Sequence, residues 1–278
     1  MIADGAIRRL GIDDLAAFED LGDSRGWGRP TVRWTIILQH ALAWGIDHPA
    51  GGLAGTVTLC AYRGGPAVLG GMLVARDCER QGLGSRLVQH AVAHANGPVL
   101  LYATDFGEPV YRRLGFVTAE TMHVHMGECS SAEAHRGNVA SESPDHHTVG
   151  RLIDLDRAAG TGDRTVIITA LAATAGARIA IHPSEDAGGL AYWSGDLLMV
   201  GPIIAESDSA AIEVAAALMT DAERSRLDAS TPQEALRHWC RNNGLAEDRT
   251  APGMILGAEP AGWEPDHRRR TLASQGFG

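Results

Sequence analysis

The sequence predicts an α+β protein made of two similar domains in tandem, and three observations lead to that prediction. Along residues 6–126, a hairpin of two strands precedes a strand–loop–helix unit. The same order of landmarks returns in the second half of the chain. Between the halves, residues 128–147 are polar, lack periodicity and contain Ser, Gly and Pro, which is typical of a linker. We therefore expect domains at residues 1–128 and 148–278, with the linker at 129–147.

Local patterns define each element of the first half. Apolar residues recur at helical intervals in residues 31–43 and 84–95, whereas residues 53–62 and 66–75 flank the turn Arg63-Gly64-Gly65. Pro109 marks a helix start and Gly115 its end. The expected elements are a strand at 6–10, helices at 12–21 and 31–43, strands at 53–62 and 66–75, a helix at 84–95, a strand at 99–103, a helix at 109–114 and a strand at 116–126.

The second half repeats landmarks of the first in the same order. Any one match could arise by chance, but their shared order indicates an internal duplication. The matching pairs are Gly71–Asp77 with Gly201–Ser207, Leu101–Thr104 with Leu227–Ser230, and Leu114–Phe116 with Asn243–Leu245.

Composition excludes several classes of protein. Hydrophobic residues make up 45% of the 278 positions and charged residues 21%, which is enough apolar material for a packed core. No apolar run reaches the roughly 20 residues of a membrane span. Asp4 stands where a signal peptide would carry basic charge, so we expect a cytoplasmic protein with no membrane partner. All 24 basic residues are arginine, which excludes a Schiff-base or Walker lysine.

Charge and metal-ligand types narrow the range of partners. The formal net charge of −10 argues against nucleic acid. The negative charge mildly favours a cationic small-molecule partner, but a need for solubility explains this charge equally well. The four cysteines lie far apart, which indicates reduced thiols and no zinc framework. His123 and His125 alternate on one strand, which we interpret as a half-exposed face, so no metal site is expected.

The loop Glu79-Arg-Gln-Gly-Leu-Gly84 carries the sharpest chemical signal. It follows an apolar strand and opens a helix, so its glycines can turn consecutive N–H groups toward one anion. Arg80 and Arg86 add positive charge. The pattern predicts a pyrophosphate cradle, although a Gly-rich turn that merely caps a helix has the same sequence.

A second motif, Tyr111-Arg-Arg-Leu-Gly-Phe116, follows this loop after the strand Val99–Thr104. Together the two motifs resemble the GNAT superfamily of acyl-coenzyme A N-acyltransferases over about residues 7–127. The tandem arrangement resembles the bacterial two-domain YitH-type branch, and mycothiol synthase less well. The features that fit this branch are Gly26-Trp27, Trp34, Ala103–Tyr111 and Leu272–Gly278.

The resemblance implies a mixed, mostly antiparallel sheet flanked by helices in each domain, with acetyl-CoA or another acyl-CoA as donor. It implies that Tyr111 protonates the departing thiolate, a role that a positioned hydroxyl can fill. A tyrosine that only packs on the core is the alternative. The donor-binding residues that the resemblance implies are Leu73, Val74, Arg80, Gln81, Gly82, Leu83, Gly84, Ser85 and Thr104.

Two positions depart from the family pattern. Glu79 stands where the family usually has Arg or Gln, and a carboxylate there would repel phosphate unless it turns away. Thr104 replaces the usual Asn seven residues before the tyrosine, a change that the YitH-type proteins share. For the base that deprotonates the amine, Asp105 is the first candidate, ahead of His123 and Glu120. A water chain is the alternative, and Asp105 can equally cap its loop.

The second half lacks both motifs. No glycine follows Ile203–Ala205, two acids occupy the loop, and the helix at residues 235–244 has no tyrosine. We therefore expect no donor site there. The leading interpretation is an N-acyltransferase, with acetyl as the expected group, acting on a small-molecule amine. The alternatives are a donor thioester on an acyl carrier protein and a non-catalytic acyl-CoA or metabolite sensor. The resemblance identifies neither the acceptor nor the oligomeric state.

Overall fold

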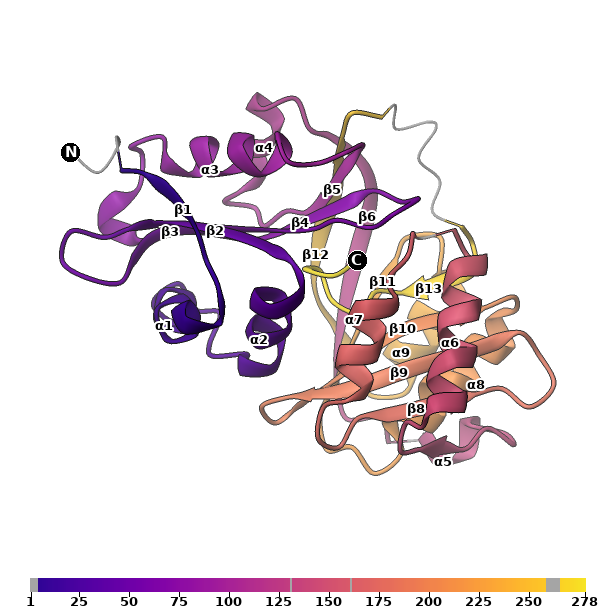
Figure 1. The fold of residues 1–278 in the computed structure, drawn as a ribbon. Coiled ribbons are helices and arrows are strands. Elements are labelled where there is room, and N and C mark those ends of the chain that lie inside the picture. Colours follow the sequence, from indigo (N-terminus) through magenta and orange to yellow (C-terminus); the bar gives the residue numbers. More distant parts are fainter. Residues whose placement is uncertain (1–4, 131, 161, 259–265) are drawn as a thin grey trace.

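One mixed sheet runs through both halves of the protein (Figure 1). The computed structural model describes residues 5–130, 132–160, 162–258 and 266–278. Over these residues the sheet has 13 strands in the order β1-β2-β3-β4-β5-β12-β6-β11-β10-β9-β8-β7, and β13 pairs with β10 off this path. Helices cover both faces of the sheet, so the predicted α+β class is confirmed.

In the first half, helices α3 and α4 lie on one face of the sheet and α1 and α2 on the other (Figure 1). The elements are β1 (Ile7–Arg9), η2 (Ile12–Asp14), α1 (Leu15–Ser24), α2 (Thr31–His40), β2 (Leu42–Asp47), β3 (Leu53–Cys60), β4 (Ala67–Val74), η3 (Arg76–Cys78), α3 (Leu83–Val92), β5 (Val99–Tyr102), α4 (Glu108–Arg113) and β6 (Val117–Gly127).

One prediction in this half is wrong. The helix expected over residues 31–43 ends at His40, and strand β2 begins at Leu42. The apolar run that starts at Ala41 continues to Ile46, and its central residues are buried between β1 and β3. Helical spacing within the first part of this run concealed a strand that is buried on both faces.

The second half repeats the arrangement, with α6 and α7 on one face and α5, α8 and α9 on the other (Figure 1). Its elements are α5 (Ala132–His135), β7 (Ser141–Glu142), α6 (His146–Ala158), α7 (Thr165–Ala172), β8 (Arg178–Ile181), β9 (Ala187–Ser194), β10 (Leu197–Ala205), α8 (Asp208–Met219), β11 (Ser225–Ser230), α9 (Glu234–Asn242), β12 (Leu245–Leu256) and β13 (Arg269–Thr271).

The segment predicted as a linker, residues 129–147, folds against the second half. It holds α5 and β7, and β7 extends the sheet by pairing with β8. Cys129 and Val139 are buried in the same core as α8. A few buried apolar residues in a polar stretch are enough to fix such a segment, and periodicity does not detect them.

The two halves exchange strands at the centre of the sheet. β12 of the second half inserts between β5 and β6 of the first, and β6 in turn pairs with β11. One apolar cluster also joins α2 of the first half to α7 of the second, through Trp34, Ile37, Ile168 and Leu171. The halves therefore share one sheet and one apolar cluster. None of the described helices is long and apolar enough to cross a membrane.

A gap opens in the sheet of the first half. The parallel strands β4 and β5 pair only at Ala67 with Val99 and at Val68 with Leu100. Opposite β3, a register shift between Thr56 and Thr58 bends β4 at this point. Beyond Val68, no described strand pairs with β4 on its β5 side, so its N–H and C=O groups on that edge remain open.

Candidate functional site

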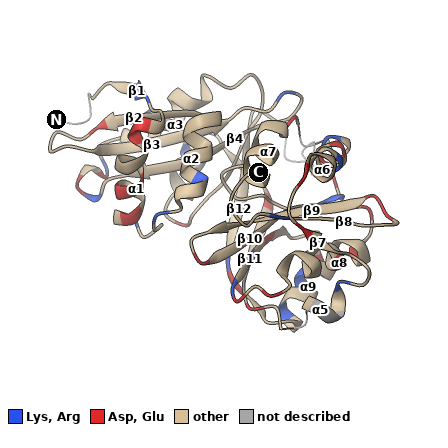
Figure 2. Cartoon of the chain, turned by 60° about the horizontal axis from the view of Figure 1, so that its bottom comes forward, with Lys and Arg blue, Asp and Glu red and all other residues tan. Residues whose placement is uncertain are grey.

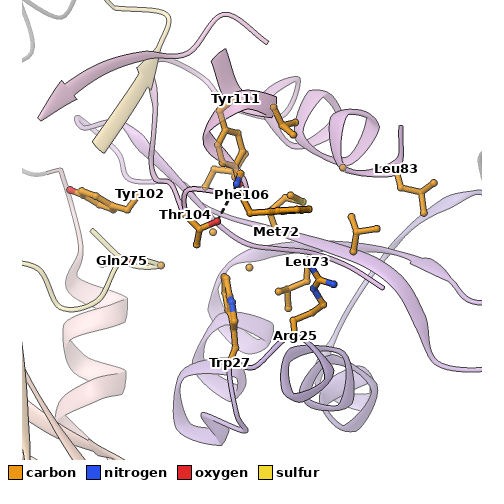
Figure 3. A pocket seen from close by; sticks show the side chains of 18 of the residues that line it. Arg25, Trp27, Met72, Leu73, Leu83, Tyr102, Thr104, Phe106, Tyr111 and Gln275 are labelled. Atoms are coloured by element: carbon orange, nitrogen blue, oxygen red, sulfur yellow. Dashed lines mark hydrogen bonds between the residues drawn. The ribbon is translucent and has the colours of Figure 1, made fainter. Parts of the chain in front are cut away.

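A cavity of about 1020 Å³ occupies the gap between β4 and β5 (Figure 3). Met72 and Leu73 of β4 cross it, Tyr111 reaches it from α4, and Trp27 faces it from the loop after α1. A volume of this size lies at the upper end of the range for small-molecule pockets, roughly 300–1,000 Å³.

The end of the cavity beside α3 has the geometry of an anion site. Arg80 and Gly82 have positive φ angles of 59° and 81°, and this backbone conformation curls the loop before the helix. Gly82 is the N-cap, no side chain caps the helix, and no acid lies in its first turn. The first N–H groups of α3 are therefore available to a ligand. A Cβ added to Gly82 would meet nothing within 4 Å, so there is space for a ligand beside this residue.

Glu79 does not oppose an anion at this site. One of its carboxylate oxygens lies 2.6 Å from Nη1 of Arg25, and both side chains are largely buried. The Arg25 guanidinium also lies 5.9 Å from the centre of the Phe106 ring. Because Arg25 balances the charge of Glu79, the departure noted in the sequence leaves the loop compatible with phosphate.

Most of the predicted donor-binding residues lie together along this cavity. Those that line it are Leu73, Val74, Arg80, Gly82, Leu83, Gly84, Ser85 and Thr104. Gln81 does not line it, and its side-chain amide donates to the carbonyl of Asp77. The arrangement fits an extended thioester donor that has its phosphates at α3 and its arm along β4. The backbone of β4 can bind such an arm. The Ala75 N–H donates to Ala54 of β3, and because successive amides along a strand point to opposite edges, the Val74 amide points toward the gap.

Tyr111 lines the cavity from α4, and its side chain is directed toward Phe106 and Thr104 (Figure 3). It is 6% exposed, and its ring packs at 5.8 Å against Phe116. Burial raises the pKa of its hydroxyl well above the usual value, because the charged phenolate is poorly solvated there. The hydroxyl is therefore protonated at neutral pH and can donate a proton.

The three candidate bases have different positions. Asp105 is exposed on the loop before α4 and is not among the residues that line the cavity. His123 contacts Thr231 and Arg237, also away from the cavity. Glu120 is buried and accepts a hydrogen bond of 2.8 Å from Tyr102, whose ring does line the cavity.

The histidine pair on β6 is more buried than expected. His125 is fully buried and the side chain of His123 is 12% exposed, whereas the sequence predicts a half-exposed face. Helix α9 packs against β6 and β12, and its Arg237 donates to His123 Nδ1, so this helix helps to cover the two rings. Burial, together with nearby Arg237 and Arg241, lowers the pKa of His125 despite the opposing charge of Glu247.

Sequence reasoning missed the far end of the cavity. Arg33, Arg226 and Arg249 line it, and so do Gln275 and Gly276 from the end of the chain. These residues come from four segments that only the exchanged strands bring together, so no local motif marks them. Two sequence features could have indicated this end of the cavity: the two tryptophans near Arg33 and the chain-end segment at 272–278. From the sequence alone, both are recognised only as features of the family resemblance.

Among the described residues, one group could offer three metal ligands. His48, Asp77 and Cys78 bring their ligand atoms within 4.8 Å of one another, and His48 Nε2 lies 3.0 Å from Asp77 Oδ2. Cys78 is buried, and burial, followed by the nearby Asp77, raises the pKa of its thiol to about 11. His48 and Asp77 hydrogen-bond each other in this cluster, and Cys78 Sγ lies 3.4 Å from Asp77 Oδ1.

The corresponding gap of the second half is filled by the protein itself. β10 and β11 pair from Leu198 to Val200 and then separate. β13 enters between them, pairs with β10 at Ile203, and is followed by Leu272, whose N–H donates to Asp228 of β11. No open strand edge comparable to that of β4 remains among the described residues of this region.

The helix that follows the second gap is also closed. The Ser207 side chain caps α8 by accepting from the Ala210 N–H, and Asp208 lies in its first turn. Arg270 of β13 donates to the carbonyls of Ala205 and Glu206 and to Asp208. These contacts occupy the region where the first half presents free amides.

Comparison with known proteins identifies both halves. Residues 39–118 match a family model described as an acetyltransferase (GNAT) domain, and residues 152–267 match a second model with the same description. A search of curated proteins found no relative with significant similarity.

Solved structures share the whole arrangement. A protein of Pyrococcus horikoshii assigned to the acetyltransferases has a TM-score of 0.76 at 18% identity, over 98% of this chain and 95% of its own. A tandem GNAT protein from the clavulanic acid biosynthesis pathway has a TM-score of 0.64 at 14% identity, over 92% and 99%. A GCN5-related N-acetyltransferase from Sphaerobacter thermophilus has 0.59 at 12% identity, over 90% and 95%. These likenesses show the fold, a GNAT fold with two domains, and the two family models each match an acetyltransferase (GNAT) domain in one half of the chain.

Proposed function

We propose that the first domain transfers an acyl group, with acetyl as the expected group, from acyl-CoA to the amine of a small molecule. One observation carries the proposal: an uncapped helix N-terminus, an open strand edge and a protonated tyrosine meet in one cavity. Each supplies a part that direct transfer from a thioester needs, namely a site for phosphate, a track for the arm and a proton donor.

In the proposed complex the amides of Gly82 to Ser85 hold the pyrophosphate, and Arg80 adds charge beside it. β4 holds the pantetheine arm along Leu73 and Val74, with Thr104 on the opposite wall. An amide of β4 polarises the thioester carbonyl as negative charge develops on its oxygen.

Transfer forms a bond between the amine nitrogen and the acyl carbon and breaks the bond between that carbon and sulfur. The nitrogen loses one proton and the sulfur gains one. Tyr111 donates the proton to sulfur. For the proton that the amine loses, Glu120 is better connected to the cavity than Asp105 or His123, because the Tyr102 hydroxyl links it to the cavity wall. We propose this route, with Tyr102 as the relay, in preference to the exposed Asp105.

The two alternative functions are less well supported. A donor on an acyl carrier protein would bring no adenosine diphosphate to the loop, so a carboxylate at Glu79 would favour it, but Arg25 neutralises that carboxylate. A non-catalytic sensor would need no proton donor, whereas Tyr111 is buried in the cavity wall with its hydroxyl kept neutral. The YitH-type assignment is supported by position, since Trp27, Trp34 and the chain-end segment all contribute to the cavity.

Two measurements test the proposal. Acetyl-CoA and coenzyme A at about 100 times their dissociation constants should each raise the free energy of unfolding by roughly 2.7 kcal/mol. Thiol release from acetyl-CoA should then depend on an added amine. Absence of any stabilisation by either compound would refute a coenzyme A site, and stabilisation without amine-dependent thiol release would favour the sensor.

A further inference from the structure

The cavity has two ends, and β4 runs from one to the other. At the α3 end, the Cβ position of Gly84 lies 3.5 Å from the Met72 side chain and 3.7 Å from that of Val74. At the other end, the Cβ position of Gly70 lies 3.1 Å from Cα of Gly276. Figure 3 shows Leu83 and Gln275 on opposite sides of the cavity. If the donor phosphates lie at α3, the end beside Gly276 is free for the acceptor.

The charge of the cavity is opposite to that of the whole protein. The chain carries a formal charge of −10, and its acidic residues are spread over α1 and the loops of both halves (Figure 2). In contrast, six arginines line the cavity, and Glu79 is the acidic member of the described lining. The donor phosphates can account for the arginines near α3, but not for those at the far end.

Arg33 is the first of these far-end arginines. Its guanidinium lies 4.3 Å from the centre of the Trp34 ring and 6.0 Å from that of Trp27, so the aromatic faces orient it. No carboxylate of the described chain lies within ion-pair distance of it, and its buried Nε has no hydrogen-bond partner there. Burial, with a smaller contribution from Arg226, lowers its pKa to about 10.

Arg249 is the second. Its Nη2 donates to Gln275 Oε1 at 3.2 Å, and among the described residues it forms no ion pair. Burial, and next the charge of Arg226, lowers its pKa. Arg226 itself is held in a two-point ion pair by Asp228, with distances of 2.8 and 2.7 Å, so it does not require a further partner. Among the described residues, Arg33 and Arg249 thus have no carboxylate partner, whereas Arg226 has Asp228. The side-chain amide nitrogen of Gln275 is also buried there without a partner.

Such an arrangement is costly unless an anion completes it. Arg33 loses hydration in this wall and is repelled by Arg226, and an oxyanion beside it, within reach of the exposed Arg249, would relieve both effects. A guanidinium held against an aromatic ring presents its remaining N–H groups in a fixed fork, which matches a carboxylate or a phosphate. A cationic acceptor such as a diamine would add to the repulsion.

We propose that the acceptor is an amine that also carries an acidic oxyanion group, and that Arg33 and Arg249 bind this group at the end of the cavity beside Gln275. The inference rests on the proposed acyltransferase function and assigns its substrate class. It reverses the weak suggestion of a cationic partner that the overall charge offers. Carboxylate and phosphate share the chemistry, and the experiment separates them.

The test compares matched pairs of amines with acetyl-CoA as donor. Glycine, β-alanine, 4-aminobutyrate, L-glutamate and L-phenylalanine are each paired with the corresponding amide, and O-phosphoethanolamine with ethanolamine; putrescine represents diamines. We expect at least one acid to exceed its neutral partner in kcat/KM by about 10- to 100-fold, the usual effect of a hydrogen bond to a charged group. Whether the phosphate or a carboxylate compound gives the larger ratio identifies the oxyanion.

Three variants assign the effect. Arg33→Gln and Arg249→Gln should each remove about 10-fold or more of the preference for the acid over its neutral partner. Arg224→Gln is the matched control, because Arg224 is exposed and lies outside the cavity. In parallel, melting temperatures are measured with coenzyme A and each amine. Acids should stabilise the complex more than amides do, and Arg249→Gln should abolish that difference.

The outcomes separate the two proposals. Equal rates and equal melting shifts for acids and amides, or a preference for putrescine, would overturn the oxyanion site and leave the acyltransferase function standing. If no amine is acetylated although acetyl-CoA binds, the acyltransferase function fails. The melting shifts then still decide whether the arginines bind an oxyanion.

Discussion

The two domains share one fold and differ at the same place, the gap between two parallel strands. In the first domain, β4 and β5 separate beyond Val68, and the gap holds a cavity. In the second, β10 and β11 separate beyond Val200, and β13 fills the gap. The fold therefore provides the gap, and a few residues decide whether it is a site or part of the core.

One segment links the two situations. Residues 269–271 form the strand that closes the second gap, and Gln275 and Gly276, a few residues later, line the first. Tyr62 and Tyr192 hold this segment through hydrogen bonds to the carbonyls of Phe277 and Ala273. The second domain thus contributes residues to the site of the first domain through the same segment that closes the gap between β10 and β11.

The largest expected effect is at Tyr111, which has no tyrosine counterpart in the second domain. Tyr111→Phe keeps the ring packing and removes the proton donor, so single-turnover rates should fall by about 10²–10⁴-fold with little change in stability or donor affinity. Trp239→Phe, in the corresponding helix α9, is the control and should leave the chemical step intact. An unchanged chemical rate in Tyr111→Phe would remove this residue from the mechanism.

The next effect concerns the closed gap. Arg270 is 7% exposed and donates to two carbonyls, Asp208 and Gln233. Arg270→Met should therefore lower the free energy of unfolding by about 2–3 kcal/mol, measured by urea denaturation. Arg268→Met, in the same segment but more exposed, should cost clearly less. Similar losses in both variants would mean that β13 is not locked by Arg270.

In the open gap, a substitution should weaken donor binding and change stability little. Gly84→Val places a side chain toward Met72 and Val74, where the donor arm is proposed to pass, and should weaken acetyl-CoA binding by about 10-fold or more by calorimetry. Stability should change little more than in Gly150→Val, a control in helix α6 where an added Cβ meets nothing within 4 Å, because the contacts at Gly84 are ordinary van der Waals distances. Gly82 is less informative, because its φ of 81° strains any replacement. Normal donor affinity in Gly84→Val would indicate that the loop only caps α3.

The smallest effect is the pH response of Tyr111. An ordinary tyrosine has a pKa of about 10, but burial raises that of Tyr111, so the neutral donor persists to higher pH. With saturating amine, the chemical rate should stay level from about pH 8.5 to 10. Because the folded state favours the neutral form, the same shift stabilises the protein below pH ~10 and is lost as the pH rises further. A rate that declines with a midpoint near 10 would contradict a buried donor.

The sequence supports much of the first domain because its signals are local. The loop at residues 79–84 and the motif at 111–116 each lie within one short segment, and the structure brings both to one cavity. Strand β2 was missed because a doubly buried strand carries the apolar run of a helix. The arginine cluster was missed for a different reason: Arg33, Arg226 and Arg249 are distant in sequence and meet through the strand exchange. Gln81 and Asp105 do not line the cavity, and the roles predicted for them stay predictions.

The contrast between the two gaps is tested most directly by the number of donor sites on each chain. Isothermal titration of the intact protein with acetyl-CoA should give one site per chain, and Gly84→Val should weaken that one site without uncovering another. The account predicts this because β13, Ser207 and Asp208 occupy the second gap and its helix. Two sites per chain, or one site whose affinity is unaffected by Gly84→Val but is lost in Arg270→Met, would contradict it.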